Sequence, residues 1–449
     1  MSRTTDMTVG SPTKHILSFA LPLILTNMGQ QLYMIADAAI VGRGVGVRAL
    51  ASVGATDWIY WLILWTVIGL TQGFSAFVAR CFGEQDYRQM NRTIATSAFL
   101  CGLISLLLTA AGLLAAKPLL LLLNTPADIL PGALMYLIVM TAGTMIVAAY
   151  NMSASILRAF GDGKSPLIAM VIAAIMNIGL DCLFVFVFHW GILGAALASV
   201  LAQAVSFLYC LYCLGKIDCI CLDKEAWRID LPLIKKLILF GIPVALRFIV
   251  ISLGGIILQS SINAQGSTFI AGYTATNKVY GLLECSAIAL GLASSTFLAQ
   301  NYGAGKHTRV KQGVRTAAII VCIMAILVGA FTFLFREGLM GLFLDIREAG
   351  GPEAFAIAVH YLTILAGCLV ILYLIHIFQN ALQAMGISIW SMCSGFMEFF
   401  ARIIMSKIVI HWIGTDALFI SEPVAWLGAL LLVMIPYFYH SKKLLSGKT

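Results

Sequence analysis

Long apolar stretches separated by short polar breaks recur along the 449 residues of this chain. A transmembrane helix needs roughly 20 consecutive apolar residues, and about twelve stretches reach that length. The apolar residues run continuously rather than alternating with polar ones, which predicts helices and excludes a transmembrane barrel. The expected spans cover residues 16–41, 55–78, 94–116, 130–157, 166–188, 191–214, 233–263, 273–299, 316–335, 354–382, 387–411 and 423–440.

The composition leads to the same class. Hydrophobic residues make up 61% of the chain, charged residues 11%, and the mean hydropathy is +0.96, which is far from a soluble globular protein. The first apolar stretch exceeds the core of a signal peptide and lacks a small-residue cleavage site, so we expect it to stay in the mature protein. The predicted fold class is an all-α polytopic membrane protein with about 12 transmembrane helices.

The basic residues predict an orientation. If the chain starts in the cytoplasm and changes sides at each span, most of the 28 lysines and arginines fall in cytoplasmic loops, as the positive-inside rule requires. We therefore expect a multi-pass protein of the cell membrane with both termini in the cytoplasm. The net charge of +8 is then a topological signal, because a nucleic-acid-binding surface would need these charges on one folded face.

The two halves of the chain resemble each other at a nearly constant shift. Phe19 and Pro22 match Phe240 and Pro243, and at almost the same shift further identities link residues 51–83 with 271–303. Each repeat holds six spans, so a pseudo-twofold axis along the membrane normal would relate two bundles that enclose a cleft. We predict an amino-terminal six-helix lobe at residues 1–215, a cytoplasmic linker at 216–236 and a carboxy-terminal six-helix lobe at 237–449.

Four polar residues are expected at a similar depth in the outer half of the first bundle: Asp37 in span 1, Asn177 and Asp181 in span 5, and Ser199 in span 6. Ionisable groups inside a bilayer are costly and usually functional. Two carboxylates, an amide and a hydroxyl at one level suit a hard cation, and one of two poorly hydrated carboxylates would hold a proton. The alternative is a hydrogen-bond network that only holds helices together.

The carboxy-terminal half carries different ionisable residues, which we expect to be buried within its spans, namely Arg247, Lys278, Glu284, Glu398 and Arg402. Glu398 and Arg402 are four residues apart on one helix face, so they can bridge each other. These residues either stabilise the bundle or, where an acid faces the cleft, attract organic cations.

Enzymatic and nucleotide-driven functions have little support. Gly163, Lys164 and Ser165 imitate the end of a phosphate-binding loop, but Arg158 occupies the position of the required glycine. A cysteine cluster at 210–221 has metal-like spacing, but its first pair lies in an apolar helix with no histidine nearby, so no metal site is expected. We expect no enzyme activity and no cofactor.

Five short segments carry a resemblance to a known family. They are the stretch from Pro22 to Asp37 that runs into 40–43, GLTQGFSAFVARCFG at 69–83, LRAFGDG at 157–163, NIGLD at 177–181 and QNYGAG at 300–305. Their order and spacing on six plus six spans resemble the multidrug and toxic compound extrusion (MATE) family, prokaryotic branch, over essentially the whole chain.

This resemblance implies two six-helix lobes in a V shape that alternate between inward-open and outward-open states. It implies export of lipophilic or cationic compounds in exchange for H⁺ or Na⁺, by a protein that we expect to be a monomer. It also implies that the four residues of the first bundle form a cation site, with Ser199 supplying a hydroxyl that some relatives supply as threonine. Finally, it implies a bend of span 1 near Pro22.

The chain departs from one sodium-coupled branch of that family, which places acids in spans 7 and 10. Span 7 offers Arg247 instead, and span 10 offers His360 and His376. Two other functions stay open. A lipid or lipid-linked oligosaccharide flippase should have a cleft richer in cations, and a receptor or scaffold would not need paired acids at matched depth.

Overall fold

The structure is a computed structural model that describes residues 4–123, 125–344, 346–347 and 350–445. Within these ranges the chain forms helices, turns and irregular segments without any β-strand, which confirms the predicted all-α class. The prediction of cytoplasmic termini concerns residues 1–3 and 446–449, which lie outside the described residues, as does the side chain of Arg43.

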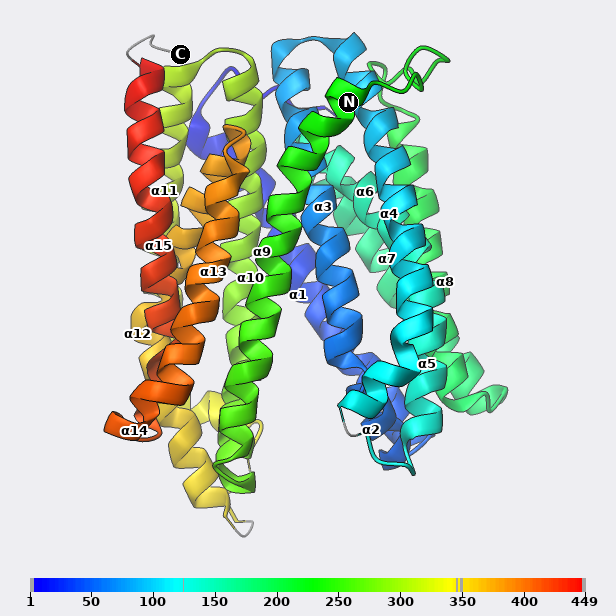
Figure 1. Cartoon of the computed structure of the whole chain (residues 1–449), viewed down its shortest axis with the longest axis vertical. Helices are drawn as coiled ribbons and strands as arrows, with labels where there is room; N and C mark the ends of the chain where they lie inside the picture. The colour runs from blue at the N-terminus through cyan, green and yellow to red at the C-terminus, as the bar shows by residue number, and fades with distance from the viewer. Residues whose placement is uncertain (1–3, 124, 345, 348–349, 446–449) are drawn as a thin grey trace. The chain divides into compact units, whose positions relative to one another are not determined.

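The helical segments of the described chain, of which Figure 1 labels the α-helices, run in the order α1 (Pro12–Gly44), α2 (Val47–Gly54), α3 (Asp57–Glu84), α4 (Tyr87–Leu122), α5 (Leu130–Ala142), α6 (Thr144–Ala159), α7 (Lys164–Asp181), η1 (Cys182–Val187), α8 (Gly191–Leu214), α9 (Leu231–Asn263), α10 (Ser267–Gly303), α11 (His307–Gly341), α12 (Gly351–Ala384), α13 (Ser388–Ile404), η2 (Met405–Val409), α14 (Ile410–Ile413) and α15 (Asp416–Leu445). The segments η1 and η2 are π-helices.

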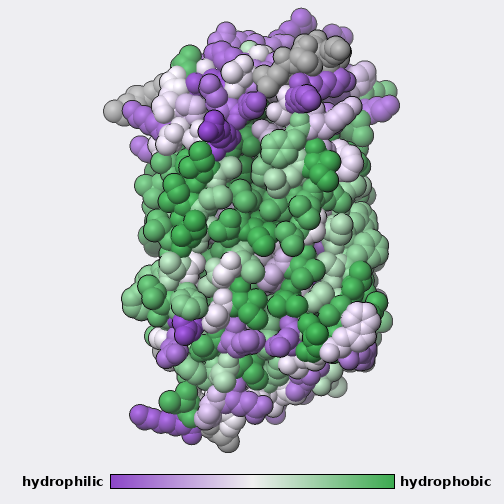
Figure 2. Space-filling view, turned by 90° about the vertical axis from the view of Figure 1, so that its left-hand side faces the viewer, coloured by the Kyte–Doolittle hydropathy of each residue, from purple (hydrophilic) through white to green (hydrophobic). Residues whose placement is uncertain are grey.

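The expected spans correspond to long helices or to pairs of consecutive helices. Nine helices of the described chain are long and apolar enough to cross a membrane, and the bent pair of α5 and α6 makes up to 10. The other two expected spans are α1, where Asn27, Gln30 and Gln31 lower the hydropathy, and α13, which has 17 residues before it continues as η2. On the face drawn in Figure 2, apolar residues fill a broad band between two hydrophilic ends.

The chain divides into two compact units. The first contains Leu21–Ala245 together with the segment up to Met7, and the second contains Thr8–Ala20 together with the residues from Leu246 onward. The division therefore falls inside two helices, α1 and α9, close to Pro22 and Pro243. These prolines occupy equivalent positions of the two repeats, and each removes one backbone hydrogen bond from its helix.

Small residues let α3 and the first half of α9 approach closely within the first unit. A Cβ added at Gly73 would lie 2.8 Å from the Phe240 carbonyl oxygen, and one added at Gly69 would lie 2.8 Å from the Ala245 backbone nitrogen. Gly69 and Gly73 are four residues apart, as are Gly241 and Ala245. Each helix thus presents two small residues on one face, a common packing device of membrane helices.

The predicted linker at 216–236 covers all but the first residue of an irregular segment, residues 215–230, and the first turns of α9. The start of α4 holds this segment. The Asn91 side chain donates to the Cys219 carbonyl oxygen at 3.2 Å and accepts from the Cys221 backbone N–H at 3.1 Å. The same end of α4 forms two ion pairs, Arg88 with Glu225 and Arg92 with Asp230.

Candidate functional site

Three helices of the first unit bring together the polar residues that were expected at one level. Asn177 and Asp181 lie one turn apart on α7, and Ser199 lies on α8, which packs against α7. The Asn177 amide nitrogen donates to the Ser199 hydroxyl at 3.3 Å. Asn177 is 1% exposed and Asp181 is 0% exposed, so both side chains point into the bundle rather than toward lipid.

The fourth residue, Asp37 on α1, faces Asp181 closely enough for a hydrogen bond between the two carboxyl groups. Two ionised carboxylates are both acceptors, so that bond requires a proton on one of them. Asp37 Oδ1 and both carboxylate oxygens of Asp181 are buried without a hydrogen-bond donor from the described chain, and so is Asn177 Oδ1. The site therefore gathers buried oxygen acceptors that a bound cation or proton would satisfy.

The backbone changes its winding at this point. Asp181 is the last residue of α7, and the chain continues as the π-helix η1. The Asp181 side chain does not cap η1, so its carboxyl group stays available to the site. Single π-helical turns inside α-helices are found frequently at functional sites.

Sequence reasoning missed three aromatic or amide side chains around this site. Tyr33, one turn before Asp37 on α1, hydrogen-bonds to the side chain of Gln203, one turn after Ser199 on α8. Tyr136 on α5 lies within electrostatic range of Asp37. The spacing of four residues could have found Tyr33 and Gln203, because it places them on the same helix faces as Asp37 and Ser199.

Pro22 lies inside α1, as the resemblance implied. Because proline has no backbone N–H, the Ser18 carbonyl oxygen loses its helical partner. The Thr26 hydroxyl donates to the Pro22 carbonyl oxygen at 2.8 Å. A second backbone carbonyl of this turn therefore accepts a hydrogen bond from a side chain. Bending of α1 at this turn stays a prediction.

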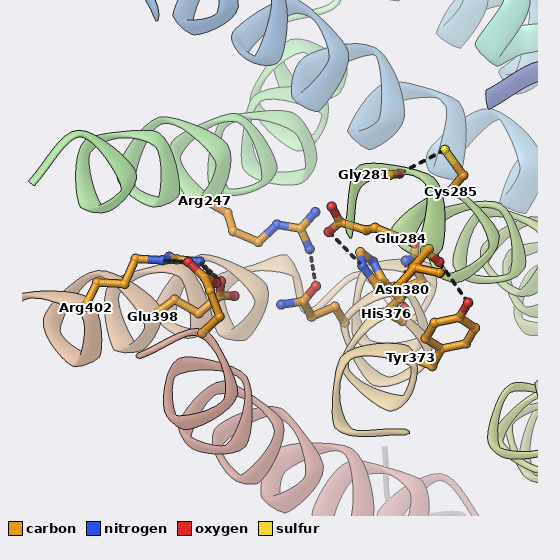
Figure 3. A network of polar contacts seen from close by, with 12 residues as sticks. Arg247, Gly281, Glu284, Cys285, Tyr373, His376, Asn380, Glu398 and Arg402 are labelled. Carbon is orange, nitrogen blue, oxygen red and sulfur yellow. Dashed lines mark hydrogen bonds and ion pairs between the residues drawn. The ribbon is translucent and has the colours of Figure 1, made fainter. Parts of the chain in front are cut away.

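The second unit contains a separate polar network, drawn in Figure 3. Arg402 pairs with Glu398 at 3.3 Å, as their spacing on α13 allows, and with Glu422 on α15 at 2.8 Å. Glu284 on α10 pairs with His376 on α12 at 3.7 Å. Sequence reasoning missed Glu422 because it precedes the expected span 12 by one residue, whereas α15 begins at Asp416 and carries it into the bundle.

The structure corrects the expectation for Lys278, which is exposed on α10 and not buried. It shares an exposed helix face with Ala271 and Thr274, whereas Ala275 and Val279 belong to a buried cluster. Glu284 is only partly buried, since its side chain is 29% exposed. Membership of a span does not tell which face of the helix a residue occupies.

Other chemistry considered from the sequence has structural explanations. In the described part of the chain, no group of three or more His, Cys, Asp or Glu residues could hold a metal ion. Residues 163–165, which imitate a phosphate-binding loop, are the beginning of α7. Asp162 caps this end by accepting from the backbone N–H groups of Lys164 at 3.0 Å and Ser165 at 2.9 Å.

The two repeats use equivalent positions for different chemistry. At the shift that aligns Pro22 with Pro243, Asn177 and Asp181 correspond to Glu398 and Arg402, and both pairs lie just before a π-helix. The opposite charges of Glu398 and Arg402 neutralise each other, whereas Asn177 and Asp181 keep oxygen acceptors without a donor among the described residues. The position equivalent to Asp37 is Leu258, so the facing acids have no counterpart in the second repeat.

Comparison with known proteins decides the family. The family model described as MatE matches residues 22–183 and, a second time, residues 243–408. This chain belongs to the MATE family. The two matches begin at the equivalent prolines Pro22 and Pro243, which confirms that the two halves of the chain are repeats.

Individual proteins resemble the chain over most of its length. It is 30% identical over 308 residues to the probable multidrug resistance protein YpnP of Bacillus subtilis (strain 168), covering 68% of each chain. It is 26% identical over 436 residues to YoeA, another probable multidrug resistance protein of that organism, covering 95% of this chain and 93% of YoeA. A solved MOP superfamily transporter from Pyrococcus furiosus Vc1 (DSM3638) has the same fold, with a TM-score of 0.91 at 23% identity over 98% of this chain and 99% of the other.

Proposed function

We propose that this MATE protein is a secondary antiporter that exports lipophilic or cationic compounds while protons enter through the site of Asp37 and Asp181. The observation that carries the proposal is the pair of facing carboxyl groups, three of whose oxygens have no donor among the described residues. A proton between these groups turns two repelling acceptors into a hydrogen bond. Its loss would weaken the packing of α1 on α7, so protonation can bias the conformation of the first unit.

Antiport requires that the proton and the exported compound favour different conformations. Each ligand then lowers the affinity for the other by the same factor, because binding linkage is reciprocal. The proton's downhill entry drives the compound outward only when both share one conformational equilibrium. Pro22, inside the helix that carries Asp37, is the natural place for that change to occur.

A proton suits this site better than Na⁺. A metal cation needs several oxygen ligands, whereas a single proton is enough to join the two facing carboxyl groups by a hydrogen bond. Sodium is the alternative, since Asn177 Oδ1 and the carboxylates could supply some of those ligands.

Transport by the purified protein in liposomes, with a pH gradient and a Na⁺ gradient imposed separately, tests this function. We expect a pH gradient alone to drive ethidium across the membrane and a Na⁺ gradient alone to drive none. Movement driven by Na⁺ at constant pH would reject the proton assignment, and no response to either gradient would reject antiport. A fluorescent phospholipid in place of ethidium tests the flippase alternative, for which we expect no gradient-dependent movement.

We also propose that the irregular segment at 215–230 lies in the cytoplasm, as the distribution of basic residues predicts. Cys221 is exposed in this segment, whereas partial burial raises the pKa of the Cys219 thiol above its ordinary value. A membrane-impermeant maleimide should therefore label Cys221 in inside-out vesicles and not in intact cells. It should label Cys219 more slowly at neutral pH, because less thiolate is present, and raising the pH should narrow the difference.

Peptide mapping by mass spectrometry would locate the label. Modification of Cys221 in intact cells would contradict the orientation. Faster labelling of Cys219 than of Cys221 at neutral pH would contradict the burial difference.

A further inference from the structure

Arg247 is a buried cation at the centre of α9. It lies at the midpoint of this helix of 33 residues, so each end is about 24 Å away at ~1.5 Å per residue. Its exposed fraction is 5%. Lipid head groups lie at the membrane interfaces, far from the middle of a spanning helix. The groups that can contact Arg247 are therefore protein side chains and any solute that enters the bundle.

The described residues that contact the Arg247 guanidinium are uncharged. Arg247 Nη1 donates to Gln379 Oε1 at 2.6 Å and to the Ser391 hydroxyl at 3.1 Å. The guanidinium carbon lies 4.5 Å from the ring centroid of Phe248. Arg247 Nε is buried and has no acceptor among the described residues. At least one donor of a permanently charged group is thus unsatisfied.

The acids nearby in this unit are engaged with other partners. Glu398 and Glu422 both pair with Arg402, and Glu284 lies 3.7 Å from His376, with which it forms an ion pair when the histidine is protonated. In Figure 3 the Arg247 side chain extends from α9 away from the Arg402 and Glu398 pair, toward the side of the network that holds Glu284 and His376. Within the described chain, no carboxylate forms an ion pair with Arg247.

The backbone around Arg247 fixes it in place. A Cβ added at Gly395 on α13 would lie 2.9 Å from Arg247 Cγ and 3.0 Å from the Arg247 carbonyl oxygen. The glycine therefore provides the space in which the arginine stem packs. Glu398 acts on Arg247 electrostatically, but no carboxylate of the described chain contacts the guanidinium directly, and its Nε–H stays without an acceptor there. A fixed guanidinium fork matches the geometry of a carboxylate or phosphate. These features describe a site prepared for an anionic group.

We propose that Arg247 binds a carboxylate or phosphate group of the transported compound, so that the second unit favours amphipathic compounds that carry an anionic group. This inference rests on the proposed function only in assuming that organic compounds bind to the protein. It does not depend on which ion drives transport. The depth of Arg247 favours a solute over a lipid head group as the source of the anion.

A matched pair of dyes tests the proposal. Rhodamine B carries a free carboxylate, and its ethyl ester has the same cationic ring system without that charge. Fluorescence anisotropy would give the affinity of the purified full-length protein for each dye. We expect the acid to bind about tenfold more tightly than the ester, the scale of one charge-assisted hydrogen bond. Arg247→Gln should bring the ratio of the two affinities close to one.

Further variants separate recognition from folding. Arg247→Lys keeps the charge without the fork and should give an intermediate ratio. Gly395→Ala leaves Arg247 present but displaced, and should lower the ratio. Lys407→Gln, which removes an exposed cation from the same unit, should leave it unchanged.

A parent protein that binds the acid no more tightly than the ester would overturn the anion site, as would an Arg247→Gln variant that keeps the preference. Binding of neither dye to the parent would instead count against the proposed function itself. Soluble phosphatidic acid analogues, added as competitors, should displace rhodamine B less effectively than a soluble aromatic carboxylate does. The opposite order would reject a solute as the source of the anion.

Discussion

Replacing Asp181 with asparagine should reduce gradient-driven efflux by about 5- to 150-fold, the range typical of one coupling interaction. Asparagine keeps the size of the side chain and removes the proton exchange that we assign to the facing carboxyl groups. Because Asp181 is 0% exposed and neither of its carboxylate oxygens has a donor among the described residues, the neutral amide should not destabilise the bundle. Efflux of ethidium from liposomes under a fixed pH gradient measures the effect.

Asp37→Asn should cause a similar loss, and the double variant should lose little more than either single one, because one proton serves both acids. Asp128→Asn is the matched control, since it removes an exposed carboxylate from a loop of the same unit. Gradient-driven efflux that survives in Asp181→Asn would contradict the site. So would losses that multiply in the double variant.

Gly73→Ala should lower the stability of the first unit by about 1–3 kcal/mol, the usual cost of forcing extra atoms into a packed interior. The added Cβ would lie 2.8 Å from the Phe240 carbonyl oxygen and 2.9 Å from the Gly241 backbone nitrogen. Those atoms belong to the backbone of α9, so they cannot turn away as the end of a side chain could. Thermal unfolding of the purified protein in detergent measures the change.

Gly102→Ala is a control for which we expect the stability to change in the opposite direction. Gly102 lies inside α4, and a Cβ there would meet nothing within 4 Å. Alanine at this position should stabilise the protein by about 0.5–1 kcal/mol, because glycine inside a helix is less favourable than alanine. If both variants shifted the melting temperature in the same direction, the close approach of α3 and α9 would not be the reason for glycine at position 73.

The sequence predicted the helices and their repeat because both depend on patterns that run over many residues. Long apolar stretches can satisfy their backbone in a bilayer only as helices, and the shift between the repeats is visible wherever the two halves keep the same side chains. Depth along each span also placed Asp37, Asn177, Asp181 and Ser199 at one level. Their contacts agree with that placement, while their role in coupling stays a prediction.

What the sequence could not provide depends on the direction of side chains around each helix and on contacts between distant segments. Lys278 was expected inside because its span is apolar, yet it belongs to the exposed face of α10. Glu422 was left out because the start of α15 could not be read from hydropathy alone. The π-helix after Asp181 was invisible as well, since a change of helical winding leaves no pattern in residue type.

Proton release on substrate binding tests the central claim most directly. Ethidium would be added to purified protein in weakly buffered solution, and the protons released would be counted with a pH-sensitive dye. If the substrate and the proton compete through the site of Asp37 and Asp181, the parent should release about one proton for each ethidium bound, and Asp181→Asn should release none. Binding without proton release by the parent, or equal release by the variant, would contradict the account.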